Sequence, residues 1–158
     1  MSGTEPSKPM EIERKFLVDR DKWEKVAKPV PKEIVQAYLL RSPEKTVRVR
    51  VKGDKGFLTI KGPTEGISRE EFEYEIPVMD AKDMIRQFAD KVITKKRYEI
   101  PFFDHTWEID VFGGNLKGLI LAEIELKDES EKFECPEWIT EEVSTDPAYF
   151  NANLIEKA

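Results

Sequence analysis

Hydrophobic and polar residues alternate with a period of two along most of the chain, which places successive side chains on opposite faces of β-strands. The clearest run, Thr46–Lys52, has a valine at every second position. Turn-forming residues separate such runs, and the Gly-Asp-Lys-Gly link at 53–56 is typical of a β-hairpin. The pattern predicts strands at Met10–Val18, Glu33–Arg41, Thr46–Lys52, Gly56–Lys61, Ser68–Ile76, Val92–Phe102, Trp107–Phe112 and Leu119–Lys127.

Helical signals are fewer. We predict helices at Asp19–Val26, at Asp80–Phe88 with Asp80 as the cap, and from Pro147, which follows Asp146, to Ile155. Residues 1–9 are polar, hold two prolines and lack apolar periodicity, which predicts a flexible lead-in. Residues 10–158 contain no repeat and no linker, so the sequence predicts a single, mainly β domain with a few peripheral helices.

Composition narrows the class of protein. The 158 residues fit one domain, and 39% hydrophobic residues suffice for a core. No apolar run approaches the roughly 18 residues that a membrane span requires. The single cysteine, Cys135, cannot form an internal disulfide and is typical of a reducing compartment, which predicts a cytoplasmic protein. A formal net charge of −6 argues against nucleic acid as a partner.

Charged residues make up 37% of the chain and gather on one face of each predicted strand. Arg48 and Arg50 alternate with valines, for example, and Glu123 and Glu125 alternate with alanine, isoleucine and leucine. One interpretation is that these faces are simply exposed to water. However, like charges two residues apart repel each other, and threonine would suit an exposed strand better. The other interpretation is that acidic and basic strands together bind a polyanion and its metal cations.

The residue types suit phosphate chemistry. Arginine binds phosphate oxygens in a bidentate manner, and lysine supplies a mobile point charge. Mg²⁺ is typically held by a few carboxylates together with substrate phosphates. If the strands close into a barrel, the charged faces line its interior, and about eight strands enclose one small ligand.

The first strand carries the charged run Glu11-Ile12-Glu13-Arg14-Lys15. Together with the arginine and glutamate pairs above, this run resembles, in order along the chain, the charged motifs of the CYTH superfamily, whose members are also called triphosphate tunnel metalloenzymes. The run itself matches the ExExK signature of that family. The segments at 36–39, 57–61 and 108–112 also agree, and the likeness extends from Met10 to the C-terminus. The compact chain is most similar to the bacterial inorganic triphosphatases. The remaining matching motifs are the RxR pair Arg48/Arg50, the KxR pair Lys95/Arg97 and the ExE pair Glu123/Glu125.

The resemblance implies a closed eight-stranded antiparallel β-barrel, or tunnel, that acts on a triphosphate with Mg²⁺ or Mn²⁺. It implies catalytic roles for Lys15, Glu13 and Glu125, and Tyr38 and Glu73 are expected to be modulatory, although packing explains Tyr38 equally well. The metal-binding residues that it implies are Glu11, Glu13, Asp110, Glu123 and Glu125. The phosphate-binding residues that it implies are Lys15, Arg48, Arg50, Lys61, Lys95 and Arg97.

The resemblance favours hydrolysis of inorganic triphosphate to pyrophosphate and phosphate. The alternatives are an adenylate cyclase of class IV type, a thiamine or nucleoside triphosphatase, and a polyphosphate-binding module without catalysis. The sequence does not decide whether the protein is a monomer or a homodimer. It also leaves open whether the C-terminal segment covers one end of the tunnel or forms a surface helix. His105 and Cys135 lack the neighbours that a nucleophilic or multi-histidine metal mechanism requires.

Overall fold

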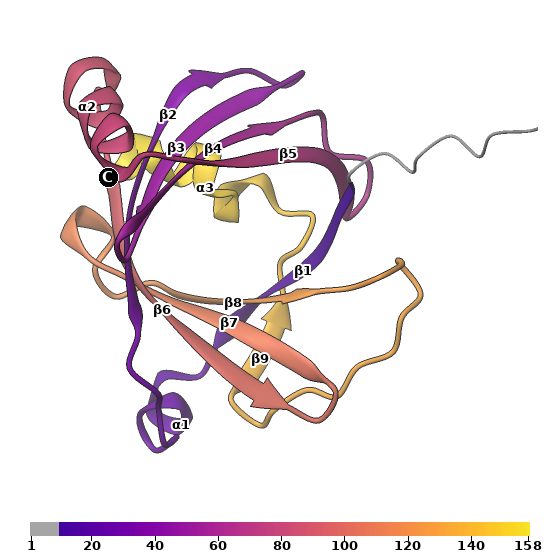
Figure 1. Ribbon diagram of the computed structural model, residues 1–158. Coiled ribbons are helices and arrows are strands. Elements are labelled where there is room, and N and C mark those ends of the chain that lie inside the picture. Colours follow the sequence, from indigo (N-terminus) through magenta and orange to yellow (C-terminus); the bar gives the residue numbers. More distant parts are fainter. Residues whose placement is uncertain (1–9) are drawn as a thin grey trace, which may run out of the picture.

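The computed structural model describes residues 10–158, in which the predicted strands form one continuous antiparallel sheet (Figure 1). The predicted lead-in at 1–9 lies outside the described residues. The strands are β1 (Met10–Val18), β2 (Lys32–Arg41), β3 (Thr46–Lys52), β4 (Lys55–Lys61), β5 (Ser68–Ile76), β6 (Ile93–Phe102), β7 (His105–Phe112), β8 (Ile120–Glu125) and β9 (Ile139–Glu142).

Strand β1 closes the sheet into a barrel. The strand order is β5-β4-β3-β2-β6-β7-β8-β1-β9, and β5 also pairs with β1. The first residues of β1, Met10 to Ile12, pair with β5, whereas residues 13–17 pair with β8. The predicted closed eight-stranded barrel is therefore confirmed, and closure removes the open edges that an unclosed sheet would expose.

Strand β9 was not predicted. Its four residues are too few to show an alternating pattern, and it forms only through pairing with the end of β1, at Phe16 and Val18. It follows a long connection from β8 and brings the chain back to the barrel.

The helices differ from prediction at their ends. Helix α1 is shorter than predicted, at Arg20–Glu24, and Asp19 caps it, because its side chain accepts a hydrogen bond from the Lys22 backbone. Helix α2 (Val78–Phe88) begins before Asp80, so the prediction of Asp80 as its cap was wrong; Pro77 precedes the helix. The predicted last helix is divided into three short pieces, η2 (Pro147–Tyr149), α3 (Asn151–Leu154) and η3 (Ile155–Lys157).

No helix in residues 10–158 combines the length and the apolar character that a membrane span requires.

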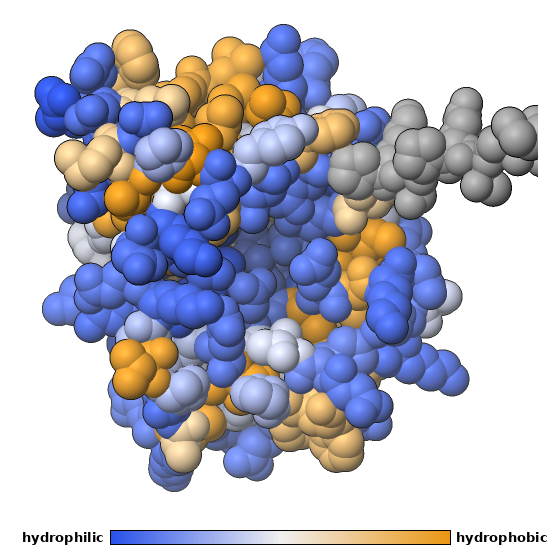
Figure 2. All heavy atoms as spheres, viewed as in Figure 1, coloured by the Kyte–Doolittle hydropathy of each residue, from blue (hydrophilic) through white to orange (hydrophobic). Residues whose placement is uncertain are grey.

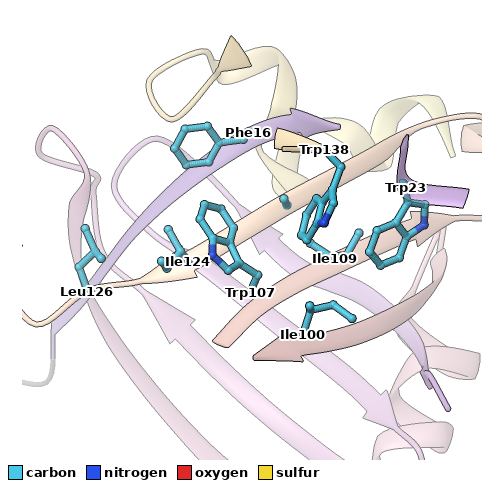
Figure 3. Packing of buried hydrophobic residues seen from close by; sticks show 9 residues of the cluster. Phe16, Trp23, Ile100, Trp107, Ile109, Ile124, Leu126 and Trp138 are labelled. Atoms are coloured by element: carbon cyan, nitrogen blue, oxygen red, sulfur yellow. The ribbon is translucent and has the colours of Figure 1, made fainter. Parts of the chain in front are cut away.

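The outward faces of β1, β7 and β8 carry a hydrophobic cluster (Figure 3). Trp107 of β7 is fully buried and packs edge-to-face on Phe16 of β1, with ring centroids 5.5 Å apart. Trp23 of α1 and Trp138, just before β9, lie together over the same face, with centroids 5.2 Å apart. Helix α1 and the segment before β9 therefore cover the apolar side of these strands, and the barrel interior is left to the charged side.

On several strands the barrel interior changes from apolar to charged along the strand. Interior positions run from Leu17 to Lys15 and Glu13 on β1, and from Ile93 to Lys95 on β6. The apolar end forms a second buried cluster, which Leu154 of α3 and Ile155 of η3 complete. The C-terminal segment thus packs onto one end of the barrel and is not a surface helix. The other buried members of this cluster are Ile93, Phe112, Leu116 and Leu121.

Helix α2 lies directly against β4 at Gly56. A Cβ atom at this position would stand 2.8 Å from the Cβ of Ala81, which is fully buried. We expect Gly56→Ala to lower the free energy of unfolding by about 1–3 kcal/mol, because the extra methyl group overpacks this contact. Urea denaturation measures the change. Gly62→Ala is the matched control, since its Cβ comes no nearer than 3.7 Å to a neighbour. Equal losses in the two variants would contradict this explanation.

Candidate active site

A cavity of ≈ 1090 Å³ occupies the charged part of the barrel interior. The face shown in Figure 2 is hollowed at its centre, and hydrophilic side chains surround the hollow. Lys95 and Asp110 do not line this cavity, because both side chains are buried behind its wall. The other residues predicted for the site do line it: Glu11, Glu13, Lys15, Tyr38, Arg48, Arg50, Lys61, Glu73, Arg97, Glu123 and Glu125.

Most cations of the cavity wall are held by carboxylates. Lys61 Nζ donates to both oxygens of Glu11, at 2.9 and 3.0 Å. Lys15 Nζ lies 3.4 Å from Glu123 Oε1, and Arg48 Nη2 lies 3.5 Å from Glu73 Oε2. In these pairs the positive charges of the barrel lining are largely compensated by its own carboxylates.

Asp110 organises the most buried of these ion pairs. Arg97 Nε and Nη2 donate to its two oxygens at 2.8 and 2.9 Å, and Lys95 Nζ lies 2.8 Å from Oδ2. Burial by itself would raise the pKa of Asp110, but the adjacent Arg97 and Lys95 charges overcome this and hold the pKa well below its usual range. Asp110 is therefore an ionised acceptor, fixed between two cations.

The carboxylates of β1 and β8 crowd together across one wall. Glu13 lies directly opposite Glu125, and Lys15 lies opposite Glu123, in the antiparallel register of these strands. Burial, followed by repulsion from Glu123 and Glu11, raises the pKa of Glu13 well above its usual range. By contrast, Lys15 and Arg97 overcome the effect of burial and lower the pKa of Glu123 to about 2.

This wall fits a divalent cation by the chemistry of its donors. Its oxygen atoms are those that Mg²⁺ and Mn²⁺ prefer, and a bound cation would relieve the repulsion around Glu13. Within residues 10–158, no three acidic, histidine or cysteine side chains converge into a ready-made metal site. The arrangement therefore suits a cation held by a few carboxylates and by the oxygens of a bound phosphate.

Arg50 differs from Arg48 and Arg97, which pair with carboxylates, because its partner is a neutral amide. Its Nε and Nη2 donate to Gln36 Oε1, at 3.0 and 2.8 Å. Burial, followed by repulsion from Arg48 and Arg97, lowers the pKa of Arg50 to about 9. Arg50 thus keeps an unneutralised charge that faces the cavity.

Tyr38 contacts both parts of the interior. It lines the cavity and also packs against the apolar cluster at the C-terminal segment.

Several lining residues were absent from the predicted site. Glu71, Glu108 and Arg69 lie on the interior face of their strands, so the two-residue period could have indicated them. The pKa of Glu71 is raised to about 7, first by burial and then by the neighbouring Glu11 against the opposing effect of Lys61. No local pattern marks Asn151, because only the path of the C-terminal segment brings it to the cavity.

His105 and Cys135 lie outside this arrangement. His105 pairs with Glu131, and Cys135 is an exposed free thiol. Neither residue lines the charged cavity.

Known proteins are similar to this chain in sequence and in fold. A family model described as the CYTH domain matches residues 9–158. An inorganic triphosphatase of Acetivibrio thermocellus is 48% identical over 147 residues, which cover 92% of this chain and 93% of the relative. An inorganic triphosphatase of Nitrosomonas europaea is 35% identical over 149 residues, or 91% of this chain and 95% of the relative.

The solved structures agree with the sequence relatives. A crystal structure of an inorganic triphosphatase aligns with 97% of this chain and 97% of its own, at 30% sequence identity and a TM-score of 0.64. Both kinds of comparison extend over more than nine tenths of the chain, and the family model spans every strand of the barrel. The chain belongs to the CYTH domain family.

Proposed function

We propose that this protein hydrolyses inorganic triphosphate to pyrophosphate and phosphate with the help of a divalent cation, Mg²⁺ or Mn²⁺. One observation carries the proposal: the cavity inside the barrel brings buried arginines and lysines together with a wall of crowded carboxylates. Such a cavity suits a polyanion that arrives with its cation. The names of the relatives, inorganic triphosphatases at 48% and 35% identity, support the same substrate.

The basic residues would hold the phosphates. Arg48, Arg50, Lys61 and Arg97 line the cavity, and their charges would be set against successive phosphate groups. Lys95 lies behind the wall and would contribute its charge from there. Fixed cations of this kind stabilise the charge that develops on a phosphoryl group during transfer.

The acidic residues would hold the cation. Glu11, Glu13, Glu123 and Glu125 supply the carboxylate oxygens, and a cation bound there would neutralise phosphate charge and favour attack by water. Asp110 would support this set indirectly, because Arg97 and Lys95 already engage both of its oxygens. Glu73 would tune the charge of its partner, Arg48.

Lys15 would lie next to the phosphate that is cleaved. Its Nζ donates to the Tyr149 carbonyl oxygen at 2.9 Å and pairs with Glu123, so its position is fixed. Burial alone would lower the pKa of Lys15, but Glu123 and Glu13 overcome this and raise it. Lys15 would therefore retain its proton and stabilise the charge that develops on the phosphate oxygens. Tyr38 of β2, which lines the same cavity, would help to shape this end of the site.

We further propose that the protein works in the cytoplasm, as a monomer or a homodimer, on a small polyphosphate substrate. The exposed free thiol of Cys135 supports a reducing compartment. Exposed apolar side chains on β4 and β5, Ile60, Phe72 and Tyr74, are compatible with a second copy.

Phosphate release from tripolyphosphate tests the proposed reaction. We expect release with Mg²⁺ or Mn²⁺ and its loss with excess EDTA, because the crowded carboxylates require a cation to accept a trianionic or more highly charged substrate. ATP and thiamine triphosphate serve as parallel substrates, and cyclic AMP formation is measured with ATP. Faster turnover of an organic triphosphate than of tripolyphosphate would contradict the proposed substrate. Tight binding without turnover under either metal would indicate a binding protein.

A further inference from the structure

We infer that Gln36 and Asn151 are positioning residues that form a neutral amide bridge, which holds Arg50 for phosphate without cancelling its charge and joins it to Lys95, whose counter-charge is Asp110. The inference rests on the proposed function, since it assigns these two cations to phosphate. Neither amide belongs to a charged motif of the barrel. The bridge joins a strand of the barrel to the C-terminal segment.

The bridge is a continuous set of hydrogen bonds. Gln36 lies opposite Arg50 in the register of β2 and β3, and its Oε1 accepts from Arg50 Nε at 3.0 Å and Nη2 at 2.8 Å. Its Nε2 donates to Asn151 Oδ1 at 3.3 Å, and the same oxygen accepts from Lys95 Nζ at 3.1 Å. One amide oxygen thus serves each cation, and the two amides are joined to each other.

The neighbours fix the orientation of both amides. A reversed Gln36 would turn its NH₂ group towards the Arg50 guanidinium, which offers only donors. A reversed Asn151 would likewise oppose its NH₂ group to Lys95 Nζ and Gln36 Nε2. Gln36 is fully buried, so such an unpaired group would have no water to compensate it.

The C-terminal segment holds Asn151 in place. Leu154 and Ile155 are buried in the apolar cluster immediately after it, and Arg41 Nη1 donates to the Ala152 carbonyl oxygen at 2.7 Å. The position of this segment therefore determines the position of the bridge. A displacement of the segment would withdraw one acceptor from Lys95 and the support from Gln36.

Neutrality is the property that distinguishes this bridge. Glu11 and Glu73 hold Lys61 and Arg48 with a full negative charge, whereas Gln36 orders Arg50 with a dipole. A carboxylate at either amide position would keep an acceptor for the cation but would place a negative charge beside the bound phosphates. The amides are thus required for their lack of charge as well as for their hydrogen bonds.

Asn151→Asp tests this requirement, because the aspartate retains an oxygen that accepts from both Lys95 and Gln36 and changes only the charge. We expect the KM for tripolyphosphate to rise by about tenfold or more, since a like charge in a low-dielectric site repels the substrate. We expect the melting temperature to stay the same or to rise. Gln36→Glu is a second variant that places the charge at Arg50, and the same rise in KM is expected. Gln87→Glu, on the exposed face of α2, is the charge-matched control.

The outcomes separate this inference from the proposed function. A purely structural role predicts that Asn151→Asp leaves KM within twofold of wild type, and this result would overturn the inference. Calorimetric titration with tripolyphosphate and Mg²⁺ provides a readout without turnover. Wild-type protein that binds tripolyphosphate without cleaving it would contradict only the proposed reaction. Equal affinity of wild type and both amide variants would contradict only the bridge.

Discussion

Glu13→Gln is expected to reduce tripolyphosphate hydrolysis by at least about 10²-fold, as the removal of one strong electrostatic contributor from an active site typically does. The fold should persist, because glutamine has the same shape and removes a carboxylate that Glu11 and Glu123 repel. Initial rates of phosphate release measure the loss, and thermal unfolding measures the fold. We expect the melting temperature to be equal to that of wild type or higher.

Two further variants make this expectation specific. Glu125, which lies opposite Glu13 across β1 and β8, should behave in the same way when changed to glutamine. Glu137→Gln alters an exposed glutamate outside the cavity and should retain full activity. Full activity in both Glu13→Gln and Glu125→Gln would refute the assignment of this wall to the cation.

Asp110→Asn is expected to have the largest effect on stability, a loss of about 3–5 kcal/mol in the free energy of unfolding, since it leaves buried cations without their counter-charge. Asp110 is the ion-pair partner of both Lys95 and Arg97. Because Arg97 Nη1 would retain its second partner, Glu108, at 3.0 Å, we expect a loss near the lower end of that range. For a chain of this size the melting temperature should fall by about 6–20 °C.

Glu99→Gln is the comparison for this loss. Glu99 lies 3.0 Å from Lys32 and 3.8 Å from Lys52, but the Lys32 side chain is exposed and that of Glu99 is 39% exposed, so the loss of these pairs should cost less than about 1 kcal/mol. If Asp110→Asn and Glu99→Gln lower the free energy of unfolding by similar amounts, burial does not determine how much the Asp110 ion pairs contribute to stability. Added tripolyphosphate should restore part of the Asp110→Asn loss, because it supplies negative charge to the same cations.

The two-residue period predicted both the strands and the inward side of the barrel. On β3, the valines and the arginines Arg48 and Arg50 can be assigned to opposite faces without any tertiary information. The order of charged motifs then indicated the family. The roles of the individual site residues remain predictions, which the variants above test.

Other features depend on contacts that no local pattern encodes. Strand β9 forms only through pairing with β1, and α2, which begins at Val78 and not after Asp80, packs Ala81 onto Gly56. Asn151 reaches the interior because the residues that follow it are buried at the apolar end of the barrel. Such positions are set by packing between distant segments, and a single sequence does not specify them.

The interior salt bridges carry a thermodynamic consequence. Lys15–Glu123 and Lys61–Glu11 each join a residue assigned to phosphate with one assigned to the cation. Triphosphate alone would compete with glutamates for the lysines, and the cation alone would compete with lysines for the glutamates. When both ligands bind, the four side chains exchange partners and no charge is left uncompensated. Each ligand should therefore strengthen the binding of the other, and linkage requires the two enhancements to be equal.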